Sequence, residues 1–123
     1  MASTQDFIAH VQELMRGAGS VSARRMFGGH GVYVDGVIVG IVIDDTLYLK
    51  TDETTRPAFV ARGLAPFVYA SKRKPTVSTS YYAPPEEALE SAAAMREWLH
   101  LALVASRRAA ASKLARPRGT RRS

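Results

Sequence analysis

The chain has 123 residues, which is enough for one domain, and 46% of them are hydrophobic, which excludes intrinsic disorder for most of its length. It contains no cysteine, so disulfide frameworks, thiol catalysis and cysteine-ligated metal centres are excluded. The N-terminus lacks the pattern of a signal peptide, and the longest apolar run, residues 37–43, is too short to cross a bilayer. We therefore expect a cytoplasmic protein without a membrane segment.

The net charge of +6 is concentrated at the C-terminal end of the chain. Residues 107–123 hold seven basic side chains and no acidic one, whereas residues 1–106 hold ten basic side chains against all eleven acids. We predict one domain over residues 1–111 and a disordered basic tail over 112–123. Such a tail either keeps the protein soluble or attracts nucleic acid weakly. Its basic side chains are Lys113, Arg116, Arg118, Arg121 and Arg122.

An amphipathic helix is predicted over residues 3–16. Its apolar side chains recur at helical spacing, Ser3 is placed to cap the first turn, and Gly17 is placed to end the last one. The apolar positions of this stripe are Phe7, Ile8, Val11, Leu14 and Met15.

Residues 21–51 have the alternating pattern of three or four antiparallel strands. Asp35-Gly36 and Asp44-Asp45 are turn signals between them. The run 37–43 is apolar at every position apart from Gly40, which predicts a central strand covered on both sides.

A short helix is predicted over residues 53–62, capped by Thr51 or Asp52, with Pro57 near its first turn and Gly63 ending it. Two strands, 66–70 and 76–82, follow, joined by a basic loop. The last helix begins at the prolines 84–85 and runs to about Ala111, with a possible break and second cap at Ser91. This order predicts an α+β two-layer sandwich, in which helices flank an antiparallel sheet of five to six strands.

No pattern in the chain indicates catalysis. Gly29-His30-Gly31 begins like a dinucleotide-binding loop, but Val34 stands where the next glycine is needed and a strand follows instead of a helix. His10, His30 and His100 are not spaced as metal ligands. We therefore predict no cofactor, no metal and no enzymatic activity.

One candidate site surrounds a pair of arginines beside a glycine-rich bend. Guanidinium groups and backbone N–H groups there are suited to bind a phosphate, a carboxylate or a protein partner. The alternative is structural, with one arginine neutralising an acid and an apolar neighbour filling the core. The residues are Arg24, Arg25, Phe27, Gly28, Gly29 and His30.

A second candidate site combines strand tyrosines with basic side chains at the strand ends. Such a face suits either the stacking of single-stranded nucleic acid or a dimer interface, because tyrosines provide large contact areas at low entropic cost. We favour the interface. The residues are Tyr33, Tyr48, Tyr81 and Tyr82, with Lys50, Lys72, Arg73 and Lys74.

Several blocks of the sequence together resemble the N-terminal domain of the TfoX/Sxy competence regulators. The resemblance runs from about residue 4 to residue 108 and includes Trp98 in the last helix. The blocks are 23–36 (ARRMFGGHGVYVDG), 44–52 (DDTLYLKTD), 66–69 (PFVY) and 80–89 (SYYAPPEEAL).

This resemblance implies a helix-flanked antiparallel sheet and a part in the bacterial regulation of DNA-uptake genes, where such proteins act alongside the cyclic-AMP receptor protein. It implies no catalytic residues. Full-length members carry a helical C-terminal domain, where this sequence has a short basic tail. We therefore predict a regulatory module that works through contacts with itself or with the transcription machinery, as a homodimer. The first alternative is a protein that binds nucleic acid directly through the aromatic and basic sheet face and the tail. The second is a small-ligand binder or an enzyme that uses His30 with Arg24 or Arg25.

Overall fold

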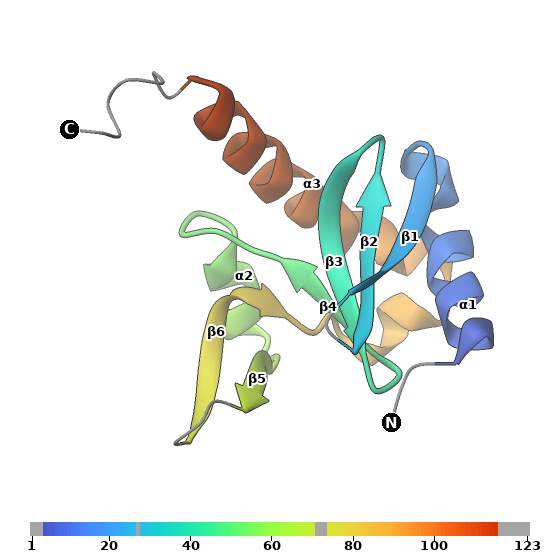
Figure 1. Cartoon of the computed structure of the whole chain (residues 1–123), viewed down its shortest axis with the longest axis horizontal. Coiled ribbons are helices and arrows are strands. Elements are labelled where there is room, and N and C mark those ends of the chain that lie inside the picture. Colours follow the sequence, from blue (N-terminus) through green and yellow to red (C-terminus); the bar gives the residue numbers. More distant parts are fainter. Residues whose placement is uncertain (1–3, 27, 71–73, 116–123) are drawn as a thin grey trace.

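The computed structural model of the chain describes residues 4–26, 28–70 and 74–115, with the side chains of all of these except 70, 79 and 115. Helices and strands follow one another as predicted, and the fold is α+β (Figure 1). The elements are α1 (Gln5–Met15), the 3-10 turn η1 (Arg16–Ala18), β1 (Val21–Met26), β2 (Gly29–Val34), β3 (Val37–Ile43), β4 (Thr46–Lys50), α2 (Arg56–Ala61), β5 (Pro66–Ala70), β6 (Pro75–Tyr82), the 3-10 turn η2 (Glu86–Leu89) and α3 (Ala92–Ala115).

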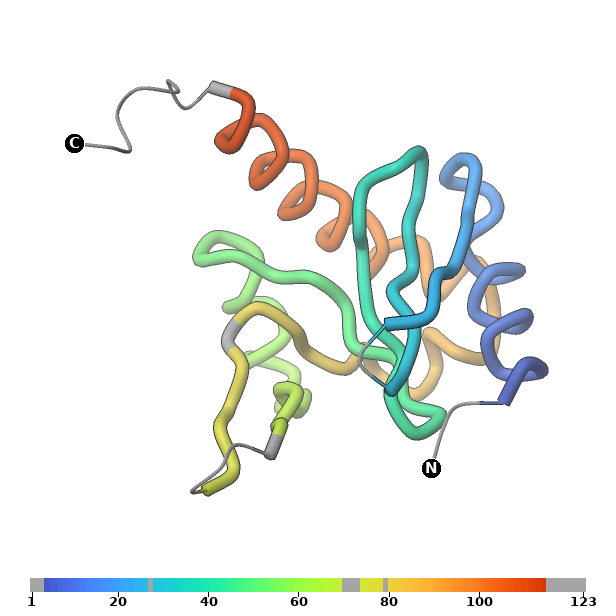
Figure 2. Tube along the Cα trace, in the orientation of Figure 1, coloured from blue at the N-terminus to red at the C-terminus, as the bar shows by residue number. Residues whose placement is uncertain are grey.

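The strands form one six-stranded antiparallel sheet in the order β1-β2-β3-β4-β6-β5. The first four strands are joined by tight turns, as expected. Asp35 and Gly36 have φ angles of 49° and 85°, and Asp44 and Asp45 have 49° and 56°. Two successive left-handed residues match the twist of a hairpin. The β5–β6 hairpin follows α2, and β6 pairs with β4, so that β5 becomes an outer edge (Figure 2).

The first helix begins one residue later than predicted and ends differently. Thr4 is its cap, because the Thr4 Oγ1 accepts a hydrogen bond of 3.1 Å from the Phe7 N–H. Ser3 lies outside the described residues. Gly17 does not end the helix: the chain continues through it in η1, and Gly19, with a φ of 150°, follows instead. A tighter 3-10 turn at the end of an α-helix is common and delays the reversal of the chain.

The short helix α2 is held at both ends by local hydrogen bonds. The Asp52 carboxylate accepts from the N–H groups of Thr54 and Thr55, each at 3.0 Å, and holds the turn before the helix. The helix itself begins at Arg56, three residues later than predicted, and Thr55, not Thr51 or Asp52, occupies its N-cap position. Pro57 lies in the first turn, where its missing N–H has no cost. At the other end, the N–H groups of residues 63 and 64 return to the Val60 and Phe59 carbonyls, the pattern of a Schellman motif.

The last helix is longer than predicted. The break falls where expected: Ser91 Oγ accepts from the Ala94 N–H at 3.0 Å and begins α3. The helix continues to Ala115, beyond the predicted end near Ala111. Residues 112–115, which the sequence placed in a disordered tail, are therefore helical. Lysine, leucine and alanine are strong helix formers, and their propensity extends the helix past the body of the domain.

Helices α1 and α3 lie against one face of the sheet and enclose the core with it (Figure 1). The Phe59 ring packs between Trp98, at 5.0 Å, and Tyr82, at 6.0 Å between ring centroids. The largest fully buried side chains are Phe59, Met15, Leu47, Leu49 and Met95.

Strand β3 is covered fully on one side only, which corrects the prediction of a strand buried on both. Val39 and Val42 are completely buried, whereas Ile41 and Ile43 on the other side are partly exposed. A register shift between β2 and β3 brings Val39 and Val42, three residues apart, onto the same face. The isoleucines are thereby left for the uncovered side of the sheet.

Polar contacts fasten α3 to the sheet and to the turn before α2. Ser106 Oγ donates a short hydrogen bond to the Ile38 carbonyl of β3. Arg108 Nε lies 3.3 Å from the Asp52 carboxylate, and its Nη1 donates to the Thr54 hydroxyl at 3.0 Å. Burial acts to raise the pKa of Asp52, but hydrogen bonds from Thr55 and Thr54 and the charge of Arg108 together hold it below its usual value.

Candidate interaction surface

No helix in the described part of the chain covers the side of the sheet opposite α1 and α3, which presents rings, aliphatic side chains and cations. We call this surface the open face. Because side chains alternate along a strand, each of its members is next to a residue that points toward the helices. The open face comprises Arg24 and Met26 of β1, Tyr33 of β2, Ile41 and Ile43 of β3, Tyr48 and Lys50 of β4, Phe67 and Tyr69 of β5, and Tyr81 of β6.

Aromatic side chains join the two halves of the open face. The rings of Tyr48 and Phe67 meet with centroids 5.0 Å apart, and Phe67 stacks on Tyr69 at 5.9 Å. Rings at these separations attract one another beyond the effect of buried area. They hold β5, at the edge of the sheet, in contact with the centre of the same face.

Each of the two cations of the open face lies over a tyrosine. The Arg24 guanidinium is 5.2 Å from the centroid of the Tyr33 ring, and Lys50 Nζ is 5.2 Å from that of Tyr81. Burial raises the pKa of the Tyr81 hydroxyl, and the neighbouring Tyr33 raises it further. The Tyr81 hydroxyl therefore stays protonated at physiological pH and offers a hydrogen bond as well as a ring face.

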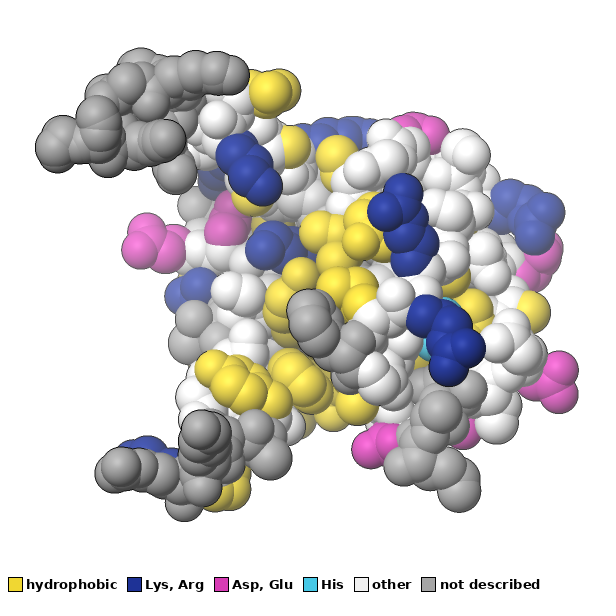
Figure 3. All heavy atoms as spheres, in the orientation of Figure 1, with side chains coloured by type: hydrophobic (Ala, Val, Ile, Leu, Met, Phe, Trp, Pro, Cys, Tyr) yellow, Lys and Arg dark blue, Asp and Glu magenta, His cyan; other side chains and the backbone are white. Residues whose placement is uncertain are grey.

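A hollow lies on the open face, on the side of the molecule where Figure 3 shows hydrophobic side chains at the surface. This cavity has a volume of about 310 Å³. Its walls come from β1, β2, β3 and β5. Because β5 is the far edge strand, the sheet must be curved enough to bring β5 close to β1 and β2. The lining side chains are mainly apolar: Met26, His30, Ile41, Ile43, Phe67 and Tyr69.

Gly29 and Gly31 allow side chains that line this hollow to pack closely against the β2 backbone. A Cβ atom on Gly29 would collide with the Val42 carbonyl oxygen and approach Ile43 Cδ1 to 2.5 Å. One on Gly31 would lie 2.6 Å from Met26 Sδ. Both positions are buried, so any larger residue would displace the walls of the cavity.

The paired arginines do not converge on one ligand. Arg24 belongs to the open face, and Arg25, the next residue of β1, points to the helix side, because successive strand residues face opposite ways. His30 is partly buried, lines the hollow, and its Nδ1 has no hydrogen-bond partner in the described part of the chain. Gly28 is exposed with a φ of 79°, and Phe27 lies outside the described residues.

The structure places three of the four candidate tyrosines on one surface and the fourth in the core. Tyr33, Tyr48 and Tyr81 share the open face, but Tyr82 is only 8% exposed and packs on Phe59 in the core. Adjacent tyrosines on one strand must separate to opposite faces. Of the basic loop, Lys74 is exposed, while Lys72 and Arg73 lie outside the described residues.

Two open-face rings were not among the predicted site residues. Phe67 and Tyr69 alternate on β5, so the sequence did contain a signal that they share one face. That they share it with Tyr48 and Ile41 depends on the position of β5 in the sheet and on its curl, which no local pattern specifies.

The charge of the sheet is one-sided. None of the six strands contains an aspartate or glutamate, although three basic residues lie on β1 and β4. Within residues 4–26, 28–70 and 74–115, no group of three or more histidine, aspartate or glutamate side chains is placed to hold a metal ion. In the same ranges, none of the helices combines the length and the apolar character needed to cross a membrane.

The fold and this surface define an α+β domain with a helix-covered core and one uncovered, basic and aromatic sheet face. Comparison with protein families assigns it: the family model of the TfoX N-terminal domain matches residues 13–106, which is most of the chain. The chain therefore belongs to the TfoX N-terminal domain family. No curated protein matches its sequence.

Proposed function

We propose that this chain is a non-enzymatic interaction module that binds a protein partner through the open face. The observation that carries the proposal is the apolar hollow of about 310 Å³, lined by rings and isoleucines on a sheet face that none of the described helices covers. Aromatic side chains around a cavity at the centre of a surface are typical of the residues that dominate binding energy in protein interfaces.

The charge of the open face supports a partner with acidic groups around an apolar side chain. Arg24 and Lys50 lie on the same face as the hollow, and the strands contain no acidic residue to neutralise them. Two copies that met through this face would bring like charges together, and their repulsion would weaken the complex. An acidic partner would instead be attracted by these cations, which strengthens binding. We therefore propose a different protein, rather than a second copy, as the partner on the open face.

Membership of the TfoX N-terminal domain family supports a role for this module in gene regulation. The resemblance to competence regulators implies control of DNA-uptake genes, and we propose that the open face contacts a component of the transcription machinery there. The predicted homodimer would then form through another surface, and light scattering on the purified protein measures its mass.

Site-specific photo-crosslinking in the native cell tests the open face. A photoreactive amino acid replaces Tyr69, which is 45% exposed, and the matched control carries it at Glu97, an exposed position on α3. We expect a discrete protein adduct from position 69, absent from position 97 and weakened by Lys50→Glu. Identical adducts from both positions, or adducts only to nucleic acid, would refute the proposal.

A second candidate function, nucleic-acid binding, is favoured by the concentration of charge after residue 106. Seven basic side chains and no acid lie there, and Arg107 and Lys113 are exposed on α3. Each phosphate contacted adds about −0.9 to the slope of log affinity against log salt.

A salt series on duplex DNA measures this slope. The full chain is compared with a variant in which Arg116, Arg118, Arg121 and Arg122 are all glutamine. If the tail binds phosphates, the slope becomes shallower in the variant. Equal slopes and equal affinities would leave the tail without a part in binding.

A further inference from the structure

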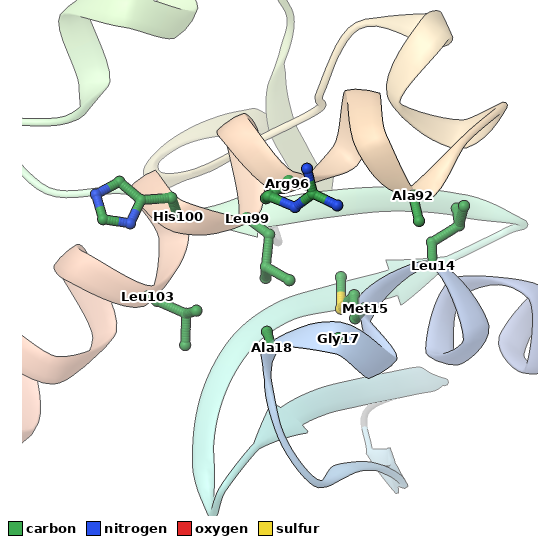
Figure 4. A pocket seen from close by; sticks show the side chains of 9 residues that line it. All are labelled: Leu14, Met15, Gly17, Ala18, Ala92, Arg96, Leu99, His100 and Leu103. Atoms are coloured by element: carbon green, nitrogen blue, oxygen red, sulfur yellow. The ribbon is translucent and has the colours of Figure 1, made fainter.

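A second cavity lies on the helix side of the molecule, at the junction of α1, η1 and α3 (Figure 4). Its volume is about 250 Å³. This exceeds the roughly 150 Å³ of a hydrocarbon cavity that binds benzene and approaches the roughly 300 Å³ at which ordinary ligand pockets begin. Buried Leu14 and Met15 of α1 face Leu99 and Leu103 of α3 across it.

A cation stands at the opening of this apolar cavity. Arg96 is exposed on α3, and Figure 4 shows its side chain on the α3 side of the group, between Leu99 and Leu14. Among the described residues, its guanidinium has neither an ion pair nor a hydrogen bond. The His100 ring lies one turn further along α3 and points away from the centre. Arg96 is thus the one lining cation directed over the apolar walls.

Small residues lie at the edge of this cavity. Gly17 is exposed, has no positive φ angle, and a Cβ atom built on it would meet nothing within 4 Å. The chain therefore tolerates a side chain at this position, where the cavity opens to solvent. Ala18 and Ala92 are the other small residues of the wall.

We propose that this cavity binds a small anionic amphiphile of the medium-chain carboxylate class. The carboxylate would pair with the Arg96 guanidinium, whose planar fork matches two carboxylate oxygens. The alkyl chain would lie against Leu14 and Leu99 and remove apolar surface from water. This site is separate from the open face, on the other side of the sheet, and does not depend on the proposed function.

An NMR titration of the full chain with octanoate tests the site, because glycine amides report on both cavities. We expect saturable shifts at the amides of Gly17 and Ala18 and none at Gly29 and Gly31, which report on the hollow of the open face. Shifts at Gly29 and Gly31 alone, or no saturable shift at Gly17, would overturn the proposal.

Variants then separate the apolar wall from the cation. Gly17→Leu places an apolar side chain at the exposed edge of the cavity, where it obstructs entry, and should weaken octanoate binding several-fold; Ala92→Leu, also at the exposed edge, serves the same purpose if the first variant fails to fold. Arg96→Gln should weaken octanoate several-fold and leave octanol unchanged. Arg107→Gln, an exposed arginine elsewhere on α3, should change neither. Unaltered octanoate affinity in folded Gly17→Leu or Arg96→Gln protein would contradict the assignment.

Discussion

The two faces of the sheet are built from the same strands and have opposite characters. Toward α1 and α3, β4 directs Leu47 and Leu49, which are buried, and toward the open face it directs Tyr48 and Lys50, which are partly exposed. The helix side is apolar and closed. On the open side, rings and aliphatic groups are partly exposed to solvent, and cations lie beside them.

This difference teaches that the open face is not simply the polar side of an ordinary half-buried sheet. A sheet face that only meets water usually alternates polar residues with the core residues. Here Ile41, Ile43 and Phe67 occupy such positions. Exposed apolar side chains at these three positions do not stabilise the fold, and their exposure therefore indicates a role in binding.

The largest expected effect contrasts neighbouring residues of β4. Leu47→Ala leaves a cavity in the closed core and should lower the free energy of unfolding by about 2–5 kcal/mol. Tyr48→Ala, on the open face, should cost less than half as much. Urea denaturation of the two variants measures both values, and equal losses would mean that the faces do not differ in packing.

A smaller effect is expected at the glycines under the hollow. Gly29→Ala places a methyl group against the Val42 backbone and should destabilise by about 1–3 kcal/mol. Gly31→Ala meets side-chain atoms only, with Met26 Sδ at 2.6 Å and Tyr33 Cε1 at 3.2 Å, and should cost less because side chains can shift. Thermal unfolding ranks the two, with Gly17→Ala as the control that should be nearly neutral; the reverse order would contradict the described packing.

A still smaller, pH-dependent effect is expected at the contact between α3 and the turn before α2. The pKa of Asp52 is lowered from 3.8 in the folded protein, so its charge stabilises the fold above this value, and the stabilisation is lost as pH falls through the lowered pKa. Asp52→Asn keeps the capping oxygen and should cost less than about 1 kcal/mol at neutral pH, since the ion pair is partly exposed.

Denaturation at neutral pH and again well below pH 3.8 checks this prediction. The difference between the intact chain and Asp52→Asn should disappear in acid. A difference that persists there would assign the effect to packing and not to charge.

The smallest effect on stability should accompany a large effect on binding. Tyr69→Ser removes a ring that is 45% exposed and should change the free energy of unfolding by about 0.5 kcal/mol or less. The photo-crosslink to a protein partner, placed at Phe67 in this variant, should nevertheless be lost. Retention of the adduct would exclude Tyr69 from the interface.

Local patterns in the sequence were sufficient for most of the elements. Alternation placed the strands, Asp35-Gly36 and Asp44-Asp45 set the turns, and Pro57 and Ser91 marked helix starts, because these signals depend on backbone geometry within a few residues. The same signals erred by one or two residues at the first helix, where Thr4 caps in place of Ser3 and Gly19 follows the last turn in place of Gly17.

The sequence by itself therefore determined the family, the α+β class and the absence of acids from the strands. Only the tertiary structure decided that Tyr82 belongs to the core and that Phe67 contacts Tyr48. It also decided that Arg24 lies on the open face, away from Arg25. The physical reason is the distance along the chain over which each signal acts. Periodicity fixes the side to which a side chain points, but strand order and sheet curl decide what it meets there.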